Sequence, residues 1–323
     1  EVLRELPRDR IVAALDAIDG EVVVDGWRTR TGRQVEERMA ELAPFVAGFL
    51  VTFVEREGRL VGLDPERARR LREAAPDREL VVAGGVATPS EIRTLDALGI
   101  DAQVGMALYT GRFHEADALV AMLPEDPPGG LWPTVVTDER GAALGLAWSD
   151  AESLRTALAE GRGVYRSRRR GLWRKGDTSG HVQELVRVEL DCDRDALRFV
   201  VRQRGPGFCH LDTHTCWGDE RGLAALERRV AAAAAGDDAG SYTRRLLEDR
   251  AWLDAKLREE AAELADASAP DAVAHEAAAV LYFPLVALRR AGLRLADVEA
   301  ELERRARRVR RRPGRAKGEE ARP

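Results

Sequence analysis

The sequence predicts a multidomain protein in which βα units are followed by a strand-rich α+β segment and then by an all-helical segment. Three observations predict this order. Up to about residue 123, short apolar runs alternate with helical periods, which is typical of parallel βα units. A stretch rich in proline and glycine, 124–130, has the composition of a linker. From about residue 222 the pattern is helical.

The first segment, 1–123, is expected to alternate strands with helices. Apolar runs of four or five residues predict the strands, and apolar residues at helical spacing predict the helices between them. In chain order we expect strands at 11–15, 21–24, 48–52, 79–83 and 102–105, and helices at 34–42, 65–74, 90–98 and 115–122.

The second segment, 131–220, is expected to contain strands at 135–137, 164–167, 182–190 and 197–202, with one helix at 151–160. The third, 222–310, is expected to be helical, with an alanine-rich joint at 231–240 and helices at 241–266, 271–291 and 295–309. Residues 311–323 form an arginine-rich tail that we interpret as frayed and solvated rather than as a polyanion-binding element.

Composition excludes several classes of protein. Hydrophobic residues make up 45% of the 323 residues and charged residues 33%, which supports a packed soluble core. A net charge of -5 is too balanced to favour a nucleic-acid binder. Without an apolar run of membrane-spanning length or a secretory leader, we expect a cytoplasmic protein. Because the chain begins with Glu1 and a strand pattern follows almost at once, we expect a fragment of a longer chain.

The cysteines predict a soft metal site. Cys192, Cys209 and Cys216 are the three cysteines of the chain. An odd, small number argues against a disulfide framework, and their clustering favours metal ligation. Three thiolates fit a catalytic zinc site that keeps a water as its fourth ligand. His210 and His214 lie close by, and either could be a fourth ligand, a general base or a hydrogen-bonding group.

Three aspartates flank the first cysteine and predict a hard metal site. Asp191, Asp193 and Asp195 follow the strand expected at 182–190, and the two-residue period of a strand would place them on one side. Their carboxylates would repel one another unless a cation such as Mg²⁺ lies among them. Cys192 would then face the other way. The alternative is that the aspartates form a turn and that the cysteines are small core residues.

A basic stretch, 167–181, precedes these residues. Forked arginine donors, glycines and small hydroxyls suit phosphate and ribose contacts, although a polar hairpin loop would look similar. Trp173 could stack on a base or simply pack. The candidate binding residues here are Arg168, Trp173, Arg174, Lys175, Thr178 and Ser179.

The runs Trp-Arg-Lys-Gly-Asp-Thr-Ser-Gly at 173–180 and Leu-Asp-Cys-Asp-Arg-Asp-Ala at 190–196, with Cys209-His210 and Cys216, resemble phosphoribosyl-AMP cyclohydrolase. The resemblance covers the segment from Leu131 to about residue 219. It implies magnesium on the aspartates, zinc on the cysteines and a site assembled across a homodimer. It also implies attack of zinc-bound hydroxide on C6 of the adenine ring, which breaks the N1–C6 bond, and we hypothesise that His210 shuttles the proton.

The helical segment carries a second set of acidic residues. Glu259, Glu260 and Glu263 lie three or four residues apart, and Glu276 follows on the next expected helix. Like charges at this spacing repel, so facing helices with such carboxylates can bind divalent metals, whereas the alternative is a solvated acidic face.

These residues, together with 241–247 and 275–282, are similar to phosphoribosyl-ATP pyrophosphohydrolase, which is all-helical and binds Mg²⁺ on a triphosphate. The similarity spans about 223–306. Two departures matter: Ala279 replaces an aspartate of the family, and its Tyr-His pair reads Tyr282-Phe283, with Pro284 following inside the expected helix. The domain could therefore serve as a dimerisation scaffold instead.

In the first segment, glycines at strand ends suit phosphate binding, although they could be simple turns; the candidates are Gly84, Gly85 and Gly105. Most of 1–120 resembles the C-terminal half of the ProFAR isomerase (β/α)8 barrel. That resemblance implies that Asp16 is a catalytic acid assisted by Thr52, with Glu57 in place of a loop aspartate. Four parallel strands cannot close a barrel, so we do not expect isomerase activity from this half-barrel alone.

Together these segments predict a multifunctional hydrolase of histidine biosynthesis that binds Zn²⁺, Mg²⁺ and phosphoribosyl nucleotides, and neither nucleic acid nor membranes. One alternative is a monofunctional cyclohydrolase whose flanking domains serve folding and dimerisation. Another is a non-catalytic zinc-binding scaffold.

Overall fold

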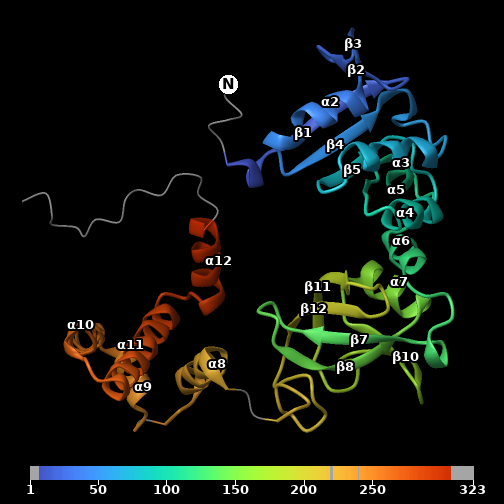
Figure 1. Cartoon of the computed structure of the whole chain (residues 1–323). Helices are drawn as coiled ribbons and strands as arrows, with labels where there is room; N and C mark the ends of the chain where they lie inside the picture. The colour runs from blue at the N-terminus through green and yellow to red at the C-terminus, as the bar shows by residue number, and fades with distance from the viewer. Residues whose placement is uncertain (1–6, 219–220, 239, 307–323) are drawn as a thin grey trace, which may run out of the picture. The chain divides into compact units, whose positions relative to one another are not determined.

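The computed structural model describes residues 7–218, 221–238 and 240–306 (Figure 1). It divides into two compact units, which meet in sequence at Trp217 and Gly218. The first unit contains a βα region, residues 7–123, and a strand-rich region, residues 131–217. The second is the helical unit. The predicted order of βα, strand-rich and all-helical parts is thus confirmed.

The βα region is built on a sheet with the strand order β3-β2-β1-β4-β5-β6. Strands β1, β4, β5 and β6 are parallel, whereas β2 and β3 form an antiparallel hairpin beside β1. Within the described residues β3 and β6 are edge strands, so this sheet does not close. The strands are β1 (Val12–Ile18), β2 (Glu21–Val24), β3 (Thr29–Gln34), β4 (Gly48–Phe53), β5 (Glu79–Ala83) and β6 (Asp101–Gln103).

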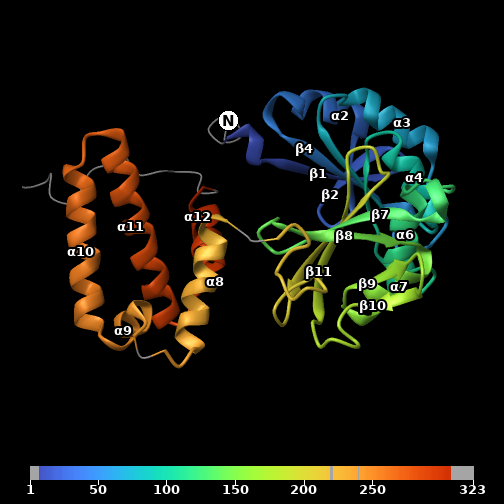
Figure 2. The same cartoon turned by 90° about the horizontal axis from the view of Figure 1, so that it is seen from below.

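Helices cover one face of this sheet (Figure 2). Met39, Leu71 and Leu95, from three successive helices, are fully buried in one core with Phe49 and Phe53 of β4. The helices are α2 (Val35–Leu42), α3 (Pro65–Ala74), α4 (Pro89–Asp96), α5 (Met106–Tyr109) and α6 (Glu115–Met122). Short 3-10 turns are η1 (Arg8–Arg10), η2 (Ala43–Phe45), η3 (Val54–Arg56) and η4 (Pro128–Gly130).

Capping residues fix where α3 and α4 begin. The Asp64 carboxylate accepts a hydrogen bond from the N–H of Arg67 at 3.2 Å, and Pro65 occupies the first helical position. At α4, Thr88 and Glu91 form a reciprocal capping box. Such caps satisfy N–H groups that have no partner inside the helix.

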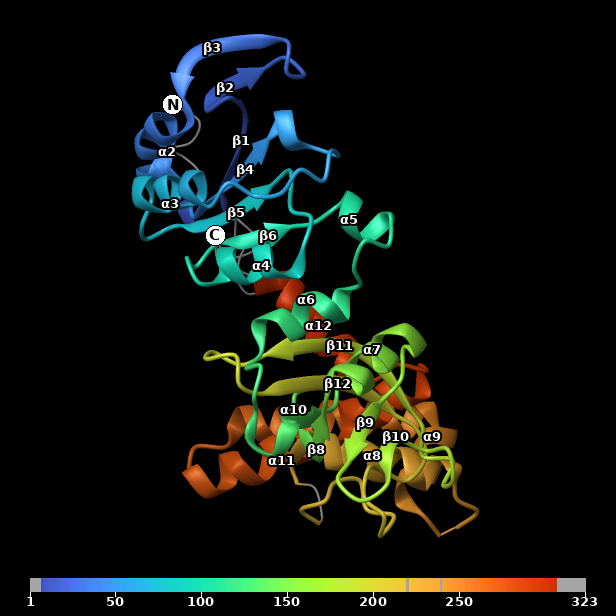
Figure 3. The same ribbon diagram turned by 90° about the vertical axis from the view of Figure 1, so that its right-hand side faces the viewer.

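The strand-rich region has a four-stranded sheet in the order β11-β12-β7-β8 and a two-stranded sheet of β9 and β10. β12 and β7 are parallel, and the other neighbours are antiparallel. Helix α6 contacts both α4 and α7, which joins the two regions (Figure 3). The elements are β7 (Trp132–Thr137), β8 (Ala143–Ser149), α7 (Ala151–Glu160), β9 (Val164–Ser167), β10 (Gly171–Arg174), β11 (Gln183–Leu190) and β12 (Leu197–Gln203).

The helical unit packs around a small apolar core. Val230, Leu246, Leu253, Phe283 and Val286 are buried there. Its helices are α8 (Gly222–Ala235), α9 (Tyr242–Glu248), α10 (Arg250–Asp266), α11 (Pro270–Arg290) and α12 (Leu295–Ala306).

One helix of the described residues, α11, could cross a membrane as judged by length and composition, with a mean hydropathy of 1.4. Glu276 interrupts its apolar sequence, so no uninterrupted apolar run of that length exists. Core helices of soluble proteins meet the same criterion, and Phe283 and Val286 of α11 lie in the core of the unit. The helix is therefore weak evidence for a membrane.

Three strands were missed by the sequence prediction. β3 is exposed at every position, so it has no alternation of buried and exposed residues. β10 is four residues long and half-buried throughout. β8 contains Gly145, which is unfavourable in a strand but leaves room for the Phe208 ring, since a Cβ there would lie 2.2 Å from the ring.

Two predictions for the helical unit were also wrong. The single helix expected at 241–266 is two helices, because Asp249 has an extended backbone and its carboxylate caps α10 by accepting from the N–H of Trp252 at 2.9 Å. The joint expected at 231–240 begins later, because α8 continues to Ala235. The expected end of the last helix at 309 and the tail at 311–323 lie outside the described residues.

Candidate metal sites

The aspartate turn, residues 191–195, connects β11 to β12. Its three carboxylates come within 4.8 Å of one another, as the sequence predicted. The predicted reason was wrong: β11 ends at Leu190, so the residues do not alternate along a strand but curl in a turn in which Arg194 has a φ of 65°. The Asp191 carboxylate holds this turn by accepting from the N–H of Asp195 at 2.9 Å and of Ala196 at 3.1 Å.

The electrostatics of the aspartate turn indicate crowded negative charge. The charge of Asp193, together with the hydrogen bond to Asp191, raises the pKa of Asp195. Burial raises the pKa of Asp191. Hydrogen bonds from the N–H groups of Ala196 and Asp195 lower it, and the net shift is downward. Three closely spaced hard oxygen donors, one of them resisting ionisation, fit a divalent cation such as Mg²⁺.

The thiol pair, Cys209 and Cys216, lies in the loop that follows β12. Cys209 is buried, and each of the two thiols affects the pKa of the other. Hydrogen bonds from the N–H of Leu211 and from Thr213 lower the pKa of Cys209, whereas burial and the charge of Cys209 raise that of Cys216. Two adjacent sulfurs that favour a shared negative charge fit a soft metal ion.

Backbone contacts fold this loop so that the sulfurs meet. Phe208 N–H donates to the carbonyl of His214 at 3.0 Å, and Cys209 N–H donates to Thr213 at 3.2 Å. Cys216 N–H donates to Leu144 of β8 at 2.9 Å. His210 is exposed, with Nδ1 3.9 Å from the sulfur of Cys209.

Cys192 is not part of the thiol pair. It is exposed on the aspartate turn, with its sulfur 4.0 Å from a carboxylate oxygen of Asp193. Among the described residues of one chain, no cluster of three metal ligands contains a cysteine. A zinc site with all three thiolates, shared between two copies of the chain as the resemblance implied, stays a prediction.

Lys175 lies beside the thiol pair, although the sequence suggested a phosphate contact. Its side chain is 5% exposed, and Nζ lies 5.5 Å from the centre of the Phe208 ring. Burial lowers the pKa of Lys175, opposed by the charges of Cys216 and Cys209. Its ammonium in turn lowers the pKa of Cys216, so it stabilises negative charge on the sulfurs.

The other residues of the basic stretch divide between a pocket and the surface. A pocket of about 620 Å³ is lined by the arginine loop, residues 166–170, and by Trp148 and Trp173. The Arg168 guanidinium lies 5.1 Å from the centre of the Trp148 ring. Arg174 is instead committed to Glu160 of α7 through two nitrogens. Thr178 and Ser179 are exposed.

Sequence reasoning missed Trp148, which forms one wall of this pocket. It lies on β8, one of the strands that was not predicted. The only available signal was a tryptophan in an apolar run at 143–149.

The helical unit contains a glutamate cluster of Glu260, Glu263 and Glu276, whose oxygens lie within 4.8 Å of one another. Burial and the charge of Glu276 raise the pKa of Glu263. Glu259 is not in the cluster, and its carboxylate pairs with Lys256 at 2.9 Å. Lys256 also pairs with Glu260 at 2.9 Å.

Aromatic residues lie next to this cluster. Tyr282 shares a hydrogen bond of 2.7 Å with Thr243, and its ring stacks on Tyr242. Phe283 is buried in the core, with Lys256 Nζ 5.8 Å from its ring centre. Ala279, where the resembling family has an aspartate, is half-buried against the same core.

In the βα region, Asp16 and Thr52 lie side by side near the carboxyl ends of β1 and β4, in register with Ala83 of β5. The Asp16 carboxylate accepts a hydrogen bond from the Trp27 indole at 2.8 Å. Glu57 is exposed. Asp16 and Thr52 are thus register neighbours, and the catalytic roles that the resemblance to the isomerase implied stay predictions.

Close backbone approach explains Gly84 and Gly85. A Cβ on Gly84 would lie 2.5 Å from the carbonyl of Phe53, and one on Gly85 would lie 2.6 Å from that of Gly62. Gly105 precedes the four-residue helix α5 and has open space around it. The close approach of the backbone is therefore a sufficient reason for glycine at 84 and 85, whether or not a phosphate binds there.

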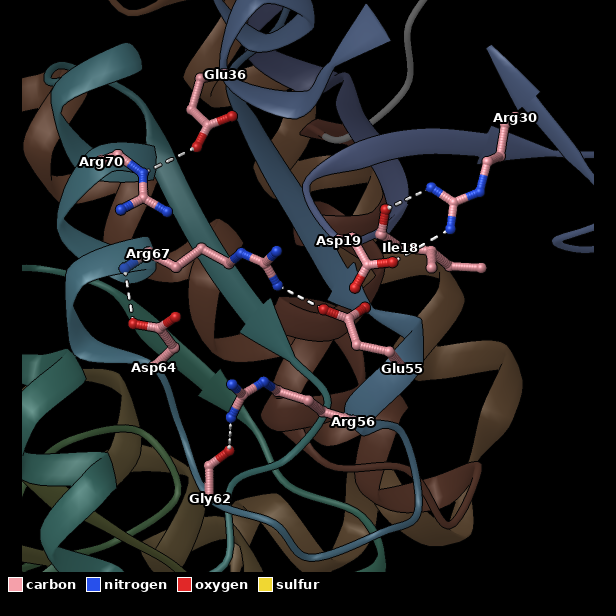
Figure 4. Close-up of polar contacts among 10 residues, drawn as sticks. All are labelled: Ile18, Asp19, Arg30, Glu36, Glu55, Arg56, Gly62, Asp64, Arg67 and Arg70. Carbon is pink, nitrogen blue, oxygen red and sulfur yellow. Dashed lines mark hydrogen bonds and ion pairs between the residues drawn. The ribbon is translucent and has the colours of Figure 1, made fainter. Parts of the chain in front are cut away.

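Arginines of the same region are held by protein partners (Figure 4). Arg67 pairs with Glu55, and Arg56 donates to the carbonyl of Gly62 at 2.9 Å. Arg30 of the hairpin reaches Asp19 at 3.2 Å. These contacts fix the loops after β1 and β4.

Three family models match successive parts of the chain. The histidine biosynthesis protein model matches residues 1–114, phosphoribosyl-AMP cyclohydrolase matches 145–218, and phosphoribosyl-ATP pyrophosphohydrolase matches 223–306. The histidine biosynthesis bifunctional protein HisIE of Pyrococcus furiosus is 33% identical over 207 residues, which are 59% of this chain and 99% of that protein. The chain belongs to the histidine biosynthesis bifunctional family.

Members of this family also occur as parts of longer proteins. The histidine biosynthesis trifunctional protein of Neurospora crassa is 38% identical over 98% of this chain and 40% of its own length. The histidine biosynthesis bifunctional protein his7 of Schizosaccharomyces pombe is 45% identical over 62% of the chain and 48% of its own length. The chain thus spans less than half of these relatives.

Proposed function

We propose that the strand-rich region is a phosphoribosyl-AMP cyclohydrolase that opens the adenine ring at the N1–C6 bond. The thiol pair carries this proposal. A buried lysine stabilises negative charge on the two adjacent sulfurs, which suits zinc ligands better than small core residues. The aspartate turn offers a separate hard site in the same region.

Zinc, when bound, supplies a water whose pKa is lowered to about 7 and which is a hydroxide near neutral pH. The residues of this chain hold the substrate and move the proton. His210, exposed with its Nδ1 3.9 Å from the Cys209 sulfur, is proposed to shuttle the proton. The pocket between Trp148 and Trp173 has a volume typical of ligand sites, and its arginines suit a phosphate.

The proposed zinc site needs Cys192 from a second subunit, so the enzyme is proposed to be a homodimer. A complementation experiment tests this. Cys192→Ser and Cys209→Ser chains are each expected to be inactive on phosphoribosyl-AMP. After denaturation and refolding together, half of the dimers are mixed, and each mixed dimer has one complete site, so about a quarter of wild-type turnover should return.

A matched control for that experiment is Cys216→Ser mixed with Cys209→Ser, which cannot rebuild a site because both residues come from the same subunit. The two readouts are turnover, followed as the loss of adenine-ring absorbance, and the amount of bound zinc. If the Cys192→Ser and Cys209→Ser mixture stays inactive, the shared site is wrong. If wild-type protein binds zinc but leaves phosphoribosyl-AMP intact, the protein is a zinc-binding scaffold and the cyclohydrolase proposal fails.

We also propose a second function, hydrolysis of phosphoribosyl-ATP to release pyrophosphate, for the helical unit. The glutamate cluster favours it, because repulsion among these carboxylates is relieved by Mg²⁺ on a triphosphate. Ala279 lies three residues after Glu276 on α11 and so shares its face. Ala279→Asp is expected to raise Mg²⁺-dependent pyrophosphate release.

Glu263→Gln is the matched loss-of-function variant for pyrophosphate release. If neither substitution changes pyrophosphate release from phosphoribosyl-ATP, the helical unit serves assembly and the protein is a monofunctional cyclohydrolase.

We propose no isomerase activity for the βα region. We propose phosphoribosyl nucleotides as ligands and the cytoplasm as the location.

A further inference from the structure

Asp96 is the last residue of α4, a position where helix electrostatics disfavour an acidic side chain. The carboxyl end of a helix carries partial negative charge and favours cations. Asp101, at the start of the next strand β6, adds a second negative charge near the same place. Arg93, the basic residue in the last turn of α4, pairs with Glu125, so a cation from another element is favoured here.

Arg194 of the aspartate turn provides that cation. Its Nη2 donates to one Asp96 oxygen at 2.7 Å and its Nε donates to the other at 3.2 Å. This paired geometry is the strongest arrangement available to an arginine and a carboxylate. The contact links the βα region to the turn that carries the proposed magnesium ligands.

Arg194 lies close enough to the carboxylates of the aspartate turn to pair with them. Its Nη1 already donates to the carbonyl of Asp191 at 3.1 Å, so the guanidinium is within reach of the carboxylates on either side of it. Both Arg194 and Asp96 line a cavity of about 720 Å³, and the Arg194 side chain is 39% exposed. Packing alone does not hold the guanidinium where it is.

We propose that Asp96 is a positioning residue that holds the Arg194 charge away from the aspartate turn, so that the turn stays open to a divalent cation. The inference rests on the proposed magnesium site. Without Asp96, the guanidinium turns back onto Asp193 or Asp195 and competes with the cation. The βα region, which has no closed barrel among its described residues, thereby contributes to the cyclohydrolase site.

The experiment titrates the full-length chain with Mn²⁺ by calorimetry and requires no turnover. All variants carry Glu260→Gln and Glu263→Gln, which remove the glutamate cluster of the helical unit. Asp96→Asn is expected to weaken Mn²⁺ binding about fivefold, because the cation must displace a partly exposed arginine. Arg93→Gln, on the same helix and paired with exposed Glu125, is the matched control and should bind as the parent does.

The decisive comparison removes the competing charge. Arg194→Gly keeps the positive φ of that position and should bind Mn²⁺ at least as tightly as the parent. The double variant Asp96→Asn with Arg194→Gly lacks the same ion pair, yet it should bind like Arg194→Gly alone. It therefore also controls for loss of folding.

Two results would overturn the proposal: binding by Asp96→Asn within twofold of the parent, or an equal loss of affinity from Asp96→Asn in the presence and absence of Arg194. Asp193→Asn separates this failure from that of the magnesium site. If Asp193→Asn leaves Mn²⁺ binding unchanged, the aspartate turn is not the cation site and both proposals fall. If it removes binding while Asp96→Asn does not weaken it, only the positioning role is wrong.

Discussion

Replacing Gly207 with alanine should disrupt the loop that brings the thiol pair together. Gly207 precedes Phe208 and Cys209, and the opposite side of the loop approaches it closely. A Cβ at Gly207 would lie 2.2 Å from the carbonyl oxygen of Thr213 and 2.4 Å from the Cα of His214. Both are backbone atoms, so no flexible side chain can move aside.

The size of the effect follows from the contacts that must break. The hydrogen bonds from Phe208 to His214 and from Cys209 to Thr213 join the two sides of the loop, and each contributes about 1 kcal/mol. Forcing a methyl group into a packed site costs about 1–3 kcal/mol more. We therefore expect a loss of about 4 kcal/mol, or about 10 °C in the Tm of a unit of this size.

The assay combines calorimetry of the full-length chain with measurement of bound zinc. Gly207→Ala should lower the transition of the first unit and reduce zinc content, because Cys209 and Cys216 separate. Gly236→Ala, in the helical unit, is the control; a Cβ there would lie at an ordinary 3.5 Å from the carbonyl of Ala232, so neither the transition of the first unit nor the zinc content should change. A Gly207→Ala protein with wild-type zinc content and a Tm within 2 °C of wild type would refute the reasoning.

Three further substitutions test other contacts. Asp150→Ala should destabilise the first unit by about 2 kcal/mol at pH 7, because the carboxylate caps α7 and pairs with Arg166. Burial raises the pKa of Asp150, but the Ser153 N–H and Arg166 lower it below its usual value, so its contribution is present above the unfolded-state pKa and disappears as pH falls through the folded-state pKa. An equal penalty in urea unfolding at pH 7 and pH 3 would contradict this. Glu91→Gln should cost about 1–2 kcal/mol in urea unfolding, because its carboxylate accepts from three backbone N–H groups; an unchanged midpoint would show that the amide replaces it. Glu263→Gln should reduce the rise in Tm of the helical unit on adding Mg²⁺, and an undiminished rise would place the cation elsewhere.

Local signals allowed many elements to be predicted to the residue. α3 begins at Pro65 directly after its cap Asp64, and α7 follows Asp150 and ends before Gly161, which has a φ of 61°. Caps and left-handed glycines act within a few residues, so the sequence alone contains them. Elements without such signals were predicted less well, above all β3, where each residue is exposed.

The candidate sites show the same division. The aspartates were predicted to lie together on one side of a strand, whereas the structure brings these near neighbours together through a turn. By contrast, no sequence signal indicated that Lys175 interacts with the thiol pair, which lies more than thirty positions away along the chain; its predicted phosphate contact stays a prediction. Arg174, for which the same role was predicted, pairs with Glu160, and its role in phosphate binding stays a prediction.

The sequence by itself determined the order of the three segments, the kinds of donor atom available and the family resemblance, because these depend on residue type and short spacing. Only the tertiary structure decided which donors meet. It paired Cys209 with Cys216 but left Cys192 apart, it placed Trp148 in the wall of the arginine pocket, and it joined Arg194 to Asp96 across 98 positions. Such long-range pairings depend on how strands and helices pack, and no local pattern encodes that packing.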